Sequence, residues 1–155
     1  MHGEVNANSI NGGNSESVFV TSHAVKALAE GLRDPRGLVN FGPREWDRLL
    51  LLGDHLQILG LLGVSLERAS LLDVLPARVS SRFLQQVQHA DLAKRNVDFE
   101  ILHLRHVAER ANVQPVLLKG AAYLACGARC GWGRVTRDVD ILVAENEIDG
   151  LVSEM

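Results

Sequence analysis

The sequence predicts an α+β fold in which a helical module precedes a short strand–helix–strand unit. From Phe19 to Ala111, apolar residues recur at the three- and four-residue spacing of amphipathic helices. Two short apolar runs follow, Val116–Leu118 and Ile141–Val143, and their length and branched side chains are typical of strands. We therefore expect three parts: a disordered tail over residues 1–17, a helical module over 18–112 and the strand unit over 113–155.

Turn residues and caps divide the helical module. Residues 1–17 are rich in Asn, Ser and Gly and offer little to bury, which is typical of a disordered tail. Asp34–Gly37 has turn composition, Pro76 stops a helix, and Asn112 suits a helix C-cap. The first predicted helix covers residues 19–32, with Ser22 as N-cap. Residues 43–62 form one helix or two, which Gly60 and Gly63 end. Two more helices are predicted over 65–75 and over 83–111, the longest.

The first strand runs directly into a candidate phosphate site. Val116–Leu118 is followed by Lys119-Gly120 and then by the helix formers of Ala121–Ala125. A strand that turns through glycine into a helix directs backbone N–H groups at one spot, which suits a phosphate, and Lys119 adds a positive charge. The alternative is that Lys119 only extends from a strand end to water.

Paired carboxylates precede the second strand. In an extended chain Asp138 and Asp140 lie on one side with Leu142, about 6–7 Å apart at Cα, while the alternating apolar residues face a core. Two such carboxylates repel each other unless a cation lies between them, and Mg²⁺ or Mn²⁺ is the natural candidate. The alternative is a solvated pair on an edge strand. With the phosphate turn, the pair predicts metal-assisted phosphoryl or nucleotidyl chemistry.

The pattern Leu118-Lys119-Gly120-Ala-Ala, then Arg134 four residues before Asp138-Val-Asp-Ile-Leu-Val, resembles an uncharacterised nucleotidyltransferase family of the polymerase-beta-like superfamily. The resemblance covers about residues 44–143. It implies that the strand unit is the first part of a nucleotidyltransferase core with a small mixed sheet.

The resemblance also implies roles for individual residues. Asp138 and Asp140 would hold Mg²⁺ against an NTP, and Lys119 and Gly120 would approach its phosphates. Arg134 and Arg137 would brace the site or contact a phosphate. Two features depart from the superfamily pattern. Alanine replaces the usual serine after Gly120, and the expected third carboxylate on a later strand is missing before Met155, so the chain looks truncated at its C-terminus.

Composition excludes several other classes of function. The net charge of −3 and the 5% aromatic content argue against a nucleic-acid partner. The N-terminus lacks the apolar segment of a signal peptide, and the longest apolar stretch, Leu49–Leu62, is too short to span a bilayer, so we expect a cytoplasmic protein. Cys126 and Cys130 have no second pair for zinc. Trp132 either lines a nucleobase or acceptor pocket or packs within its loop.

The predicted function is transfer of a nucleoside monophosphate from an NTP to the hydroxyl of a small-molecule or protein acceptor. The alternative is a non-catalytic, truncated remnant that binds a nucleotide or serves as a protein-interaction module. Two strands leave an open sheet edge, which favours self-association or pairing with a partner.

Overall fold

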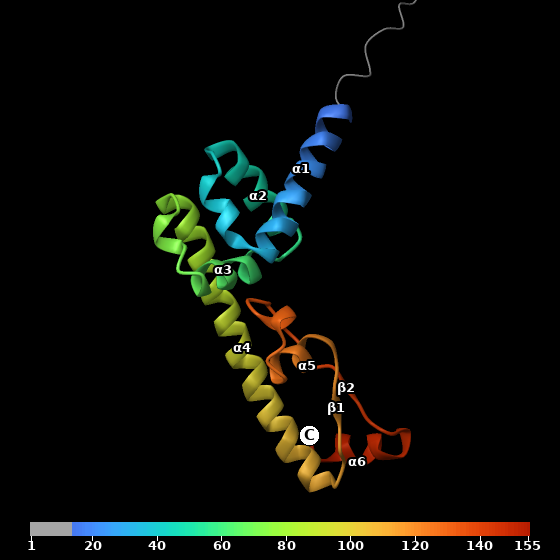
Figure 1. Cartoon of the computed structure of the whole chain (residues 1–155). Coiled ribbons are helices and arrows are strands. Elements are labelled where there is room, and N and C mark those ends of the chain that lie inside the picture. Colours follow the sequence, from blue (N-terminus) through green and yellow to red (C-terminus); the bar gives the residue numbers. More distant parts are fainter. Residues whose placement is uncertain (1–13) are drawn as a thin grey trace, which may run out of the picture.

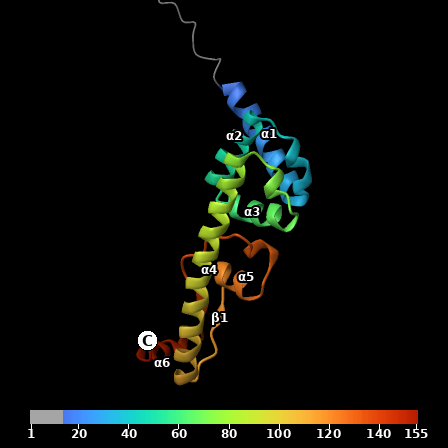
Figure 2. The ribbon, with the colours of Figure 1, turned by 90° about the vertical axis from the view of Figure 1, so that its left-hand side faces the viewer.

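The computed structural model describes residues 14–155, with side chains described from His23 onward. Three helices gather at one end of the long helix α4, and the strands with the remaining helices lie along its other half (Figure 1). A view turned by 90° shows the same division (Figure 2). The α+β class predicted from the sequence is therefore confirmed.

The elements follow one another in the predicted order, with several shifted boundaries. The helices and strands are α1 (Asn14–Arg33), α2 (Pro43–His55), α3 (Leu59–Arg68), α4 (Ala77–Ala111), β1 (Val116–Leu117), α5 (Lys119–Ala125), β2 (Ile141–Leu142) and α6 (Ile148–Ser153). Short 3₁₀ segments occupy Pro35–Asn40, Leu72–Val74, Arg129–Gly131 and Glu145–Glu147.

Large side chains fill the core between α1, α2, α3 and the first half of α4, which we call the helical core. Trp46 and Phe83 lie at its centre, 1% and 0% exposed, with their rings edge to face and 6.0 Å apart. Both lie on the faces that the helical periodicity predicts. The other buried members are Leu28, Leu38, Leu49, Leu59, Leu62, Leu66, Leu72, Leu75 and Val79.

The predicted break at Gly60 and Gly63 is wrong, because α3 runs through both glycines. The chain breaks earlier, at Gln57, whose φ of 55° lies in the left-handed region. Gly63 instead allows α3 to approach α4: a Cβ there would meet Val87 Cγ2 at 2.8 Å. The predicted helix over 65–75 is accordingly the end of α3 followed by a 3₁₀ turn.

The ends of α1 and α4 also differ from the prediction in part. Of the tail predicted over residues 1–17, residues 1–13 lie outside the described part of the chain. From Asn14 the chain is helical, which places Ser22 inside α1 and not at its N-cap. α4 begins after Pro76, six residues earlier than expected, and buried Val79 extends its apolar stripe. The predicted C-cap Asn112 is confirmed, with left-handed φ and ψ of 53° and 43°.

A second, smaller core joins the end of α4 to the strands. We call it the strand core; its buried members are Val107, Ala108, Val113 and Leu151, and Ile141 and Val143 pack against them. Arg110 of α4 fastens α6 by donating from Nε to Glu154 Oε2 and from Nη2 to the Glu154 carbonyl, both at 2.8 Å. The end of α4 thus covers one face of the sheet.

The strands are shorter than predicted. β1 and β2 pair antiparallel with Val116 opposite Leu142 and Leu117 opposite Ile141, so the expected small mixed sheet is a two-stranded antiparallel ladder in the described residues. Asp138 and Asp140 precede β2 and do not belong to it. The inward and outward alternation holds, because Ile141 packs on the strand core while Leu142 is 58% exposed.

Across residues 14–155, none of the helices combines the length and the apolar character needed to cross a membrane.

Candidate functional site

The antiparallel ladder brings Lys119 and Asp140 together. Beyond the Leu117–Ile141 pair, the Leu118 N–H donates to the Asp140 carbonyl at 2.9 Å. The backbone pairing therefore continues to Asp140, the residue immediately before β2. Lys119 follows directly and its Nζ lies 3.2 Å from Asp140 Oδ2. The lysine side chain is 73% exposed and the carboxylate 35%. This pair contributes little to folding because water screens it.

The turn between β1 and α5 is formed differently from the prediction. Lys119 carries the left-handed backbone conformation, with φ of 49°, whereas Gly120 has an ordinary φ. Few residues other than Gly, Asn, Asp and His adopt this conformation, and in the described chain Gln57 and Ser70 do so as well, at the ends of α2 and α3. Gly120 is required for space, because a Cβ there would lie 2.7 Å from Thr136 Oγ1.

Thr136 is a buried polar residue at this turn that the sequence did not single out. It is 7% exposed, and its Oγ1 has no hydrogen-bond partner among the described residues. No spacing or motif in the sequence marks this threonine; its role follows only from its packing against Gly120.

Asp138 provides the second carboxylate. It is exposed, two residues before Asp140 in the extended segment that leads into β2. Within the part of the chain whose side chains are described, the ion pair at this site joins Lys119 to Asp140 and does not include Asp138. No cluster of three or more His, Cys, Asp or Glu side chains is found among the described residues. The site therefore offers two hard oxygen donors.

The two predicted arginines lie apart from each other. Arg134 lines a hollow of about 270 Å³ together with Trp132, whereas Arg137 lines a separate hollow of about 320 Å³ with His89. Lys119, Asp138 and Asp140 line neither of these hollows. The structure thus joins Lys119 with Asp140 and does not bring the two arginines to one point.

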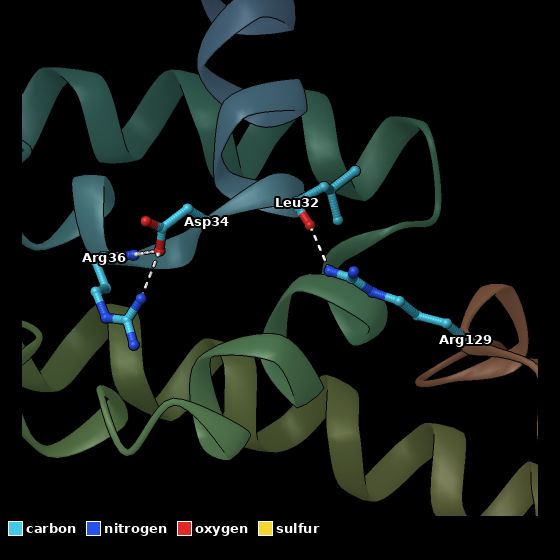
Figure 3. A network of polar contacts seen from close by, with 4 residues as sticks. All are labelled: Leu32, Asp34, Arg36 and Arg129. Atoms are coloured by element: carbon cyan, nitrogen blue, oxygen red, sulfur yellow. Dashed lines mark hydrogen bonds and ion pairs between the residues drawn. The ribbon is translucent and has the colours of Figure 1, made fainter.

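The loop between α5 and β2 is fixed to the helical core by backbone contact. Gly133, with φ of 60°, touches Gly60 of α3 so closely that a Cβ on Gly60 would lie 2.0 Å from the Gly133 carbonyl oxygen. Arg129 adds a hydrogen bond from its Nη2 to the Leu32 carbonyl at the end of α1, 2.7 Å long, which Figure 3 shows. Figure 3 also shows Asp34, which accepts from the Arg36 N–H and caps the next 3₁₀ segment.

These observations define a class of protein: an α+β protein with a strand–turn–helix, a lysine at the turn and a carboxylate pair in the segment just before the neighbouring strand. The model of a family described as uncharacterised nucleotidyltransferase matches residues 42–155. Because this match covers most of the chain, the protein belongs to that family, as the sequence pattern indicated. No curated protein and no solved structure matches the chain. Family membership indicates nucleotidyl transfer as the reaction class and an NTP as substrate.

Proposed function

We propose that this protein transfers a nucleoside monophosphate from an NTP to an acceptor hydroxyl, with Asp138 and Asp140 as the metal-binding carboxylates. The observation that carries the proposal is the Lys119–Asp140 contact of 3.2 Å at the end of the β1–β2 ladder. A lysine beside a carboxylate pair offers one group for a triphosphate and two for a cation.

The carboxylate pair suits Mg²⁺ or Mn²⁺. Asp138 and Asp140 supply carboxylate oxygens, the donors these ions prefer, and Mg²⁺ usually takes its remaining ligands from water and substrate phosphates. When bound, the ion would neutralise phosphate charge and activate the attacking oxygen.

Lys119 and Gly120 would position the triphosphate. The Lys119 side chain extends into solvent beside Asp140, so its ammonium group can move from the carboxylate to an incoming phosphate. Gly120 lets the start of α5 pack directly on Thr136, since a Cβ there would lie 2.7 Å from Thr136 Oγ1. In the transfer itself, the acceptor oxygen bonds to the α-phosphorus, the bond to pyrophosphate breaks, and the hydroxyl proton passes to solvent.

Arg134 and Arg137 have different parts in this proposal. Both are exposed on the segment that leads to Asp138. They line separate hollows, so one arginine would brace the phosphates while the other contacts a different part of a substrate.

A second function, a protein-interaction module, is favoured by the outer face of the sheet. The cross-strand partners Val116 and Leu142 are 56% and 58% exposed on the side away from α4. Exposed apolar pairs beside unpaired strand edges are typical of surfaces that pair with another chain. Sedimentation over a range of protein concentrations tests this: self-association that Leu142→Lys abolishes would support the module.

A calorimetric titration tests the enzyme proposal. ATP, GTP, CTP and UTP are titrated into the folded protein with Mg²⁺ and then with EDTA. We expect binding of at least one nucleotide that requires the metal and that the double variant Asp138→Asn/Asp140→Asn weakens by about a hundredfold, as expected for loss of two metal-ligand carboxylates.

A matched control removes the same charge elsewhere. Glu30 and Asp73 are exposed acids of the helical module, so Glu30→Gln/Asp73→Asn alters net charge equally and should leave nucleotide binding unchanged. Equal binding by wild type and by the Asp138/Asp140 double variant would refute the assignment of these carboxylates. Absence of binding by any of the four nucleotides to the folded protein would refute the enzyme proposal for this chain.

A further inference from the structure

A hollow beside Trp132 lies one helical turn from Lys119 and has no part in holding the carboxylate pair. We call it the Trp132 hollow. It encloses about 270 Å³ between α3, α4, α5 and the loop that follows α5. Arg68, Lys94, Tyr123, Trp132 and Arg134 are among the residues that line it.

An arginine is already held in position inside this hollow. The Arg68 guanidinium carbon lies 3.6 Å from the centre of the Trp132 ring, which is a close cation–π contact. A guanidinium stacked on an aromatic ring loses little further freedom when its N–H groups bind an anion, and its planar fork fits a carboxylate or a phosphate. The stack therefore prepares Arg68 for an anion.

The charges that line the hollow favour an anion as well. Arg68, Lys94 and Arg134 are cationic, and Asp91 is the one acid among the lining residues. Lys94 is neutralised by Asp98, one turn further along α4. Within the described side chains, neither Arg68 nor Arg134 forms an ion pair. Two arginines without an ion pair among the described side chains thus line one hollow.

The remaining lining is apolar and flat. Val64, Ala90 and Leu124 supply aliphatic surface, and the Trp132 and Tyr123 rings lie beside it. Such a lining suits the body of an organic ligand, because a small number of polar groups then fix its orientation. A bare inorganic ion would leave this surface unused.

The walls of the hollow are held rigidly. Gly131 lies so close to α5 that a Cβ would come within 3.0 Å of the Tyr123 carbonyl oxygen. The Ala128 N–H donates to that same carbonyl at 3.0 Å. The contact between Gly133 and Gly60 fixes the far end of the loop. A preformed hollow binds without the cost of ordering a loop.

The position of the hollow connects it with the proposed reaction. Tyr123 follows Lys119 by four residues on α5, a rise of about 6 Å along the helix axis. Arg134 belongs to the segment that leads to Asp138. A molecule in the hollow would therefore contact α5, which begins at Lys119, and the start of the segment that leads to the carboxylates.

We propose that the Trp132 hollow binds the second substrate, and that this acceptor is an organic anion in which a carboxylate or phosphate group contacts Arg68 and Arg134. The identification of the ligand as acceptor rests on the proposed nucleotidyl transfer; the anion site itself does not.

Fluorescence titration of the full chain tests the anion site without nucleotide or metal. Benzoate and phenyl phosphate serve as probes for the two anion types, and neutral benzamide serves as the control of similar shape. We expect a saturable change in tryptophan emission with at least one anion, about tenfold weaker binding of benzamide, and a similar loss in Arg68→Gln, as for one charge-assisted hydrogen-bonding group. Trp132→Phe should remove the signal, because Trp46 is buried in the helical core.

Matched variants separate this result from general damage. Arg105 is an exposed arginine of α4 that pairs with Glu109, so Arg105→Gln should bind the probes as wild type does. Thermal denaturation should confirm that Arg68→Gln remains folded. Binding of benzamide equal to that of benzoate and phenyl phosphate, no loss in folded Arg68→Gln, or no saturable signal with either anion would overturn the anion site.

The acceptor role is tested by a different result. If the probes bind but the NTP titration fails, the anion site stands and the acceptor role is refuted. If both sites bind, Arg68→Gln should leave NTP affinity unchanged, because Arg68 is outside the carboxylate site. A parallel loss of NTP affinity in this variant would show that the two sites are one.

Discussion

The helical core and the strand core are built on the same helix but with very different side chains. The first half of α4 packs Phe83 against Trp46 and a set of leucines, whereas the second half packs Val107 and Ala108 against a few aliphatic residues and, among the described residues, no aromatic ring. The strand core therefore buries much less apolar surface, and apolar burial is the main source of folding free energy.

This difference separates the part of the protein with the larger core from the part that carries the proposed catalytic residues. The proposed catalytic residues lie at the end of the ladder, on the part with the smaller core. The loop before them is fixed to the stronger part through Gly60 and Gly133. Elements with few buried contacts open more easily, so we expect the strand unit to open before the helices unfold.

The largest expected effect on the free energy of unfolding follows from creating a cavity in the helical core. Phe83→Ala should lower the free energy of unfolding by about 4 kcal/mol, because a fully buried ring is replaced by a cavity. Urea denaturation measures the change. Phe99→Ala on the same helix is the control, since Phe99 is 73% exposed and its loss should cost less than about 0.5 kcal/mol. Equal effects of the two variants would contradict the packing described for α4.

The glycine contact between the two parts comes next. Gly133→Ala should cost about 3 kcal/mol, because the new Cβ would meet the Gly60 carbonyl carbon at 2.1 Å and φ is 60°. Gly150→Ala is the matched control: it lies in α6 with open space around it and should stabilise by about 0.5 kcal/mol. A neutral Gly133→Ala in urea denaturation would mean that the loop is not fixed at this point.

A cavity in the strand core sharpens the comparison. Val107→Ala should cost about 2 kcal/mol, from the two methyl groups lost and the space left behind. Hydrogen exchange should show lost protection in β1 and β2 and unchanged protection in α2 and α3. Val152→Ala, at a 62% exposed position of α6, is the control. A uniform loss of protection across both parts would show that they unfold as one unit.

The smallest expected effect concerns the buried hydroxyl. Thr136→Val should stabilise by about 1 kcal/mol, because a buried hydroxyl without a hydrogen-bond partner is replaced by a methyl group of similar shape. Thr136→Ser keeps the hydroxyl, loses the methyl group and should destabilise. Thermal denaturation compares the three proteins; destabilisation by valine would mean that Oγ1 makes a hydrogen bond in solution.

The sequence predicted the parts of this fold that depend on local patterns. The long apolar stripe located α4, and Asn112 located its C-cap. Alternation of apolar and acidic residues predicted that the side of the extended segment with Ile141 faces the core. The errors fell at Gly60 and Gly63, which resemble helix ends in sequence but serve close packing, because the residues that need the space are distant in the chain.

The site shows the same limit. The motif placed Lys119 and the two aspartates within one unit, and the ladder joins Lys119 with Asp140. Nothing local marks Arg68 or Thr136, because each acts through a partner far away in sequence: Arg68 stacks on Trp132, and Thr136 packs on Gly120. Such pairs depend on tertiary packing, which periodicity and spacing do not encode.

The most direct test of the central proposal locates the metal and nucleotide together. Mn²⁺ is added to the isotope-labelled protein with a non-hydrolysable ATP analogue, and broadening of backbone amide signals is followed by NMR. We expect broadening centred on residues 118–120 and 138–141 that disappears in Asp138→Asn/Asp140→Asn. Broadening centred elsewhere, or unchanged in that variant, would contradict the assignment of the carboxylate pair as the metal and nucleotide site.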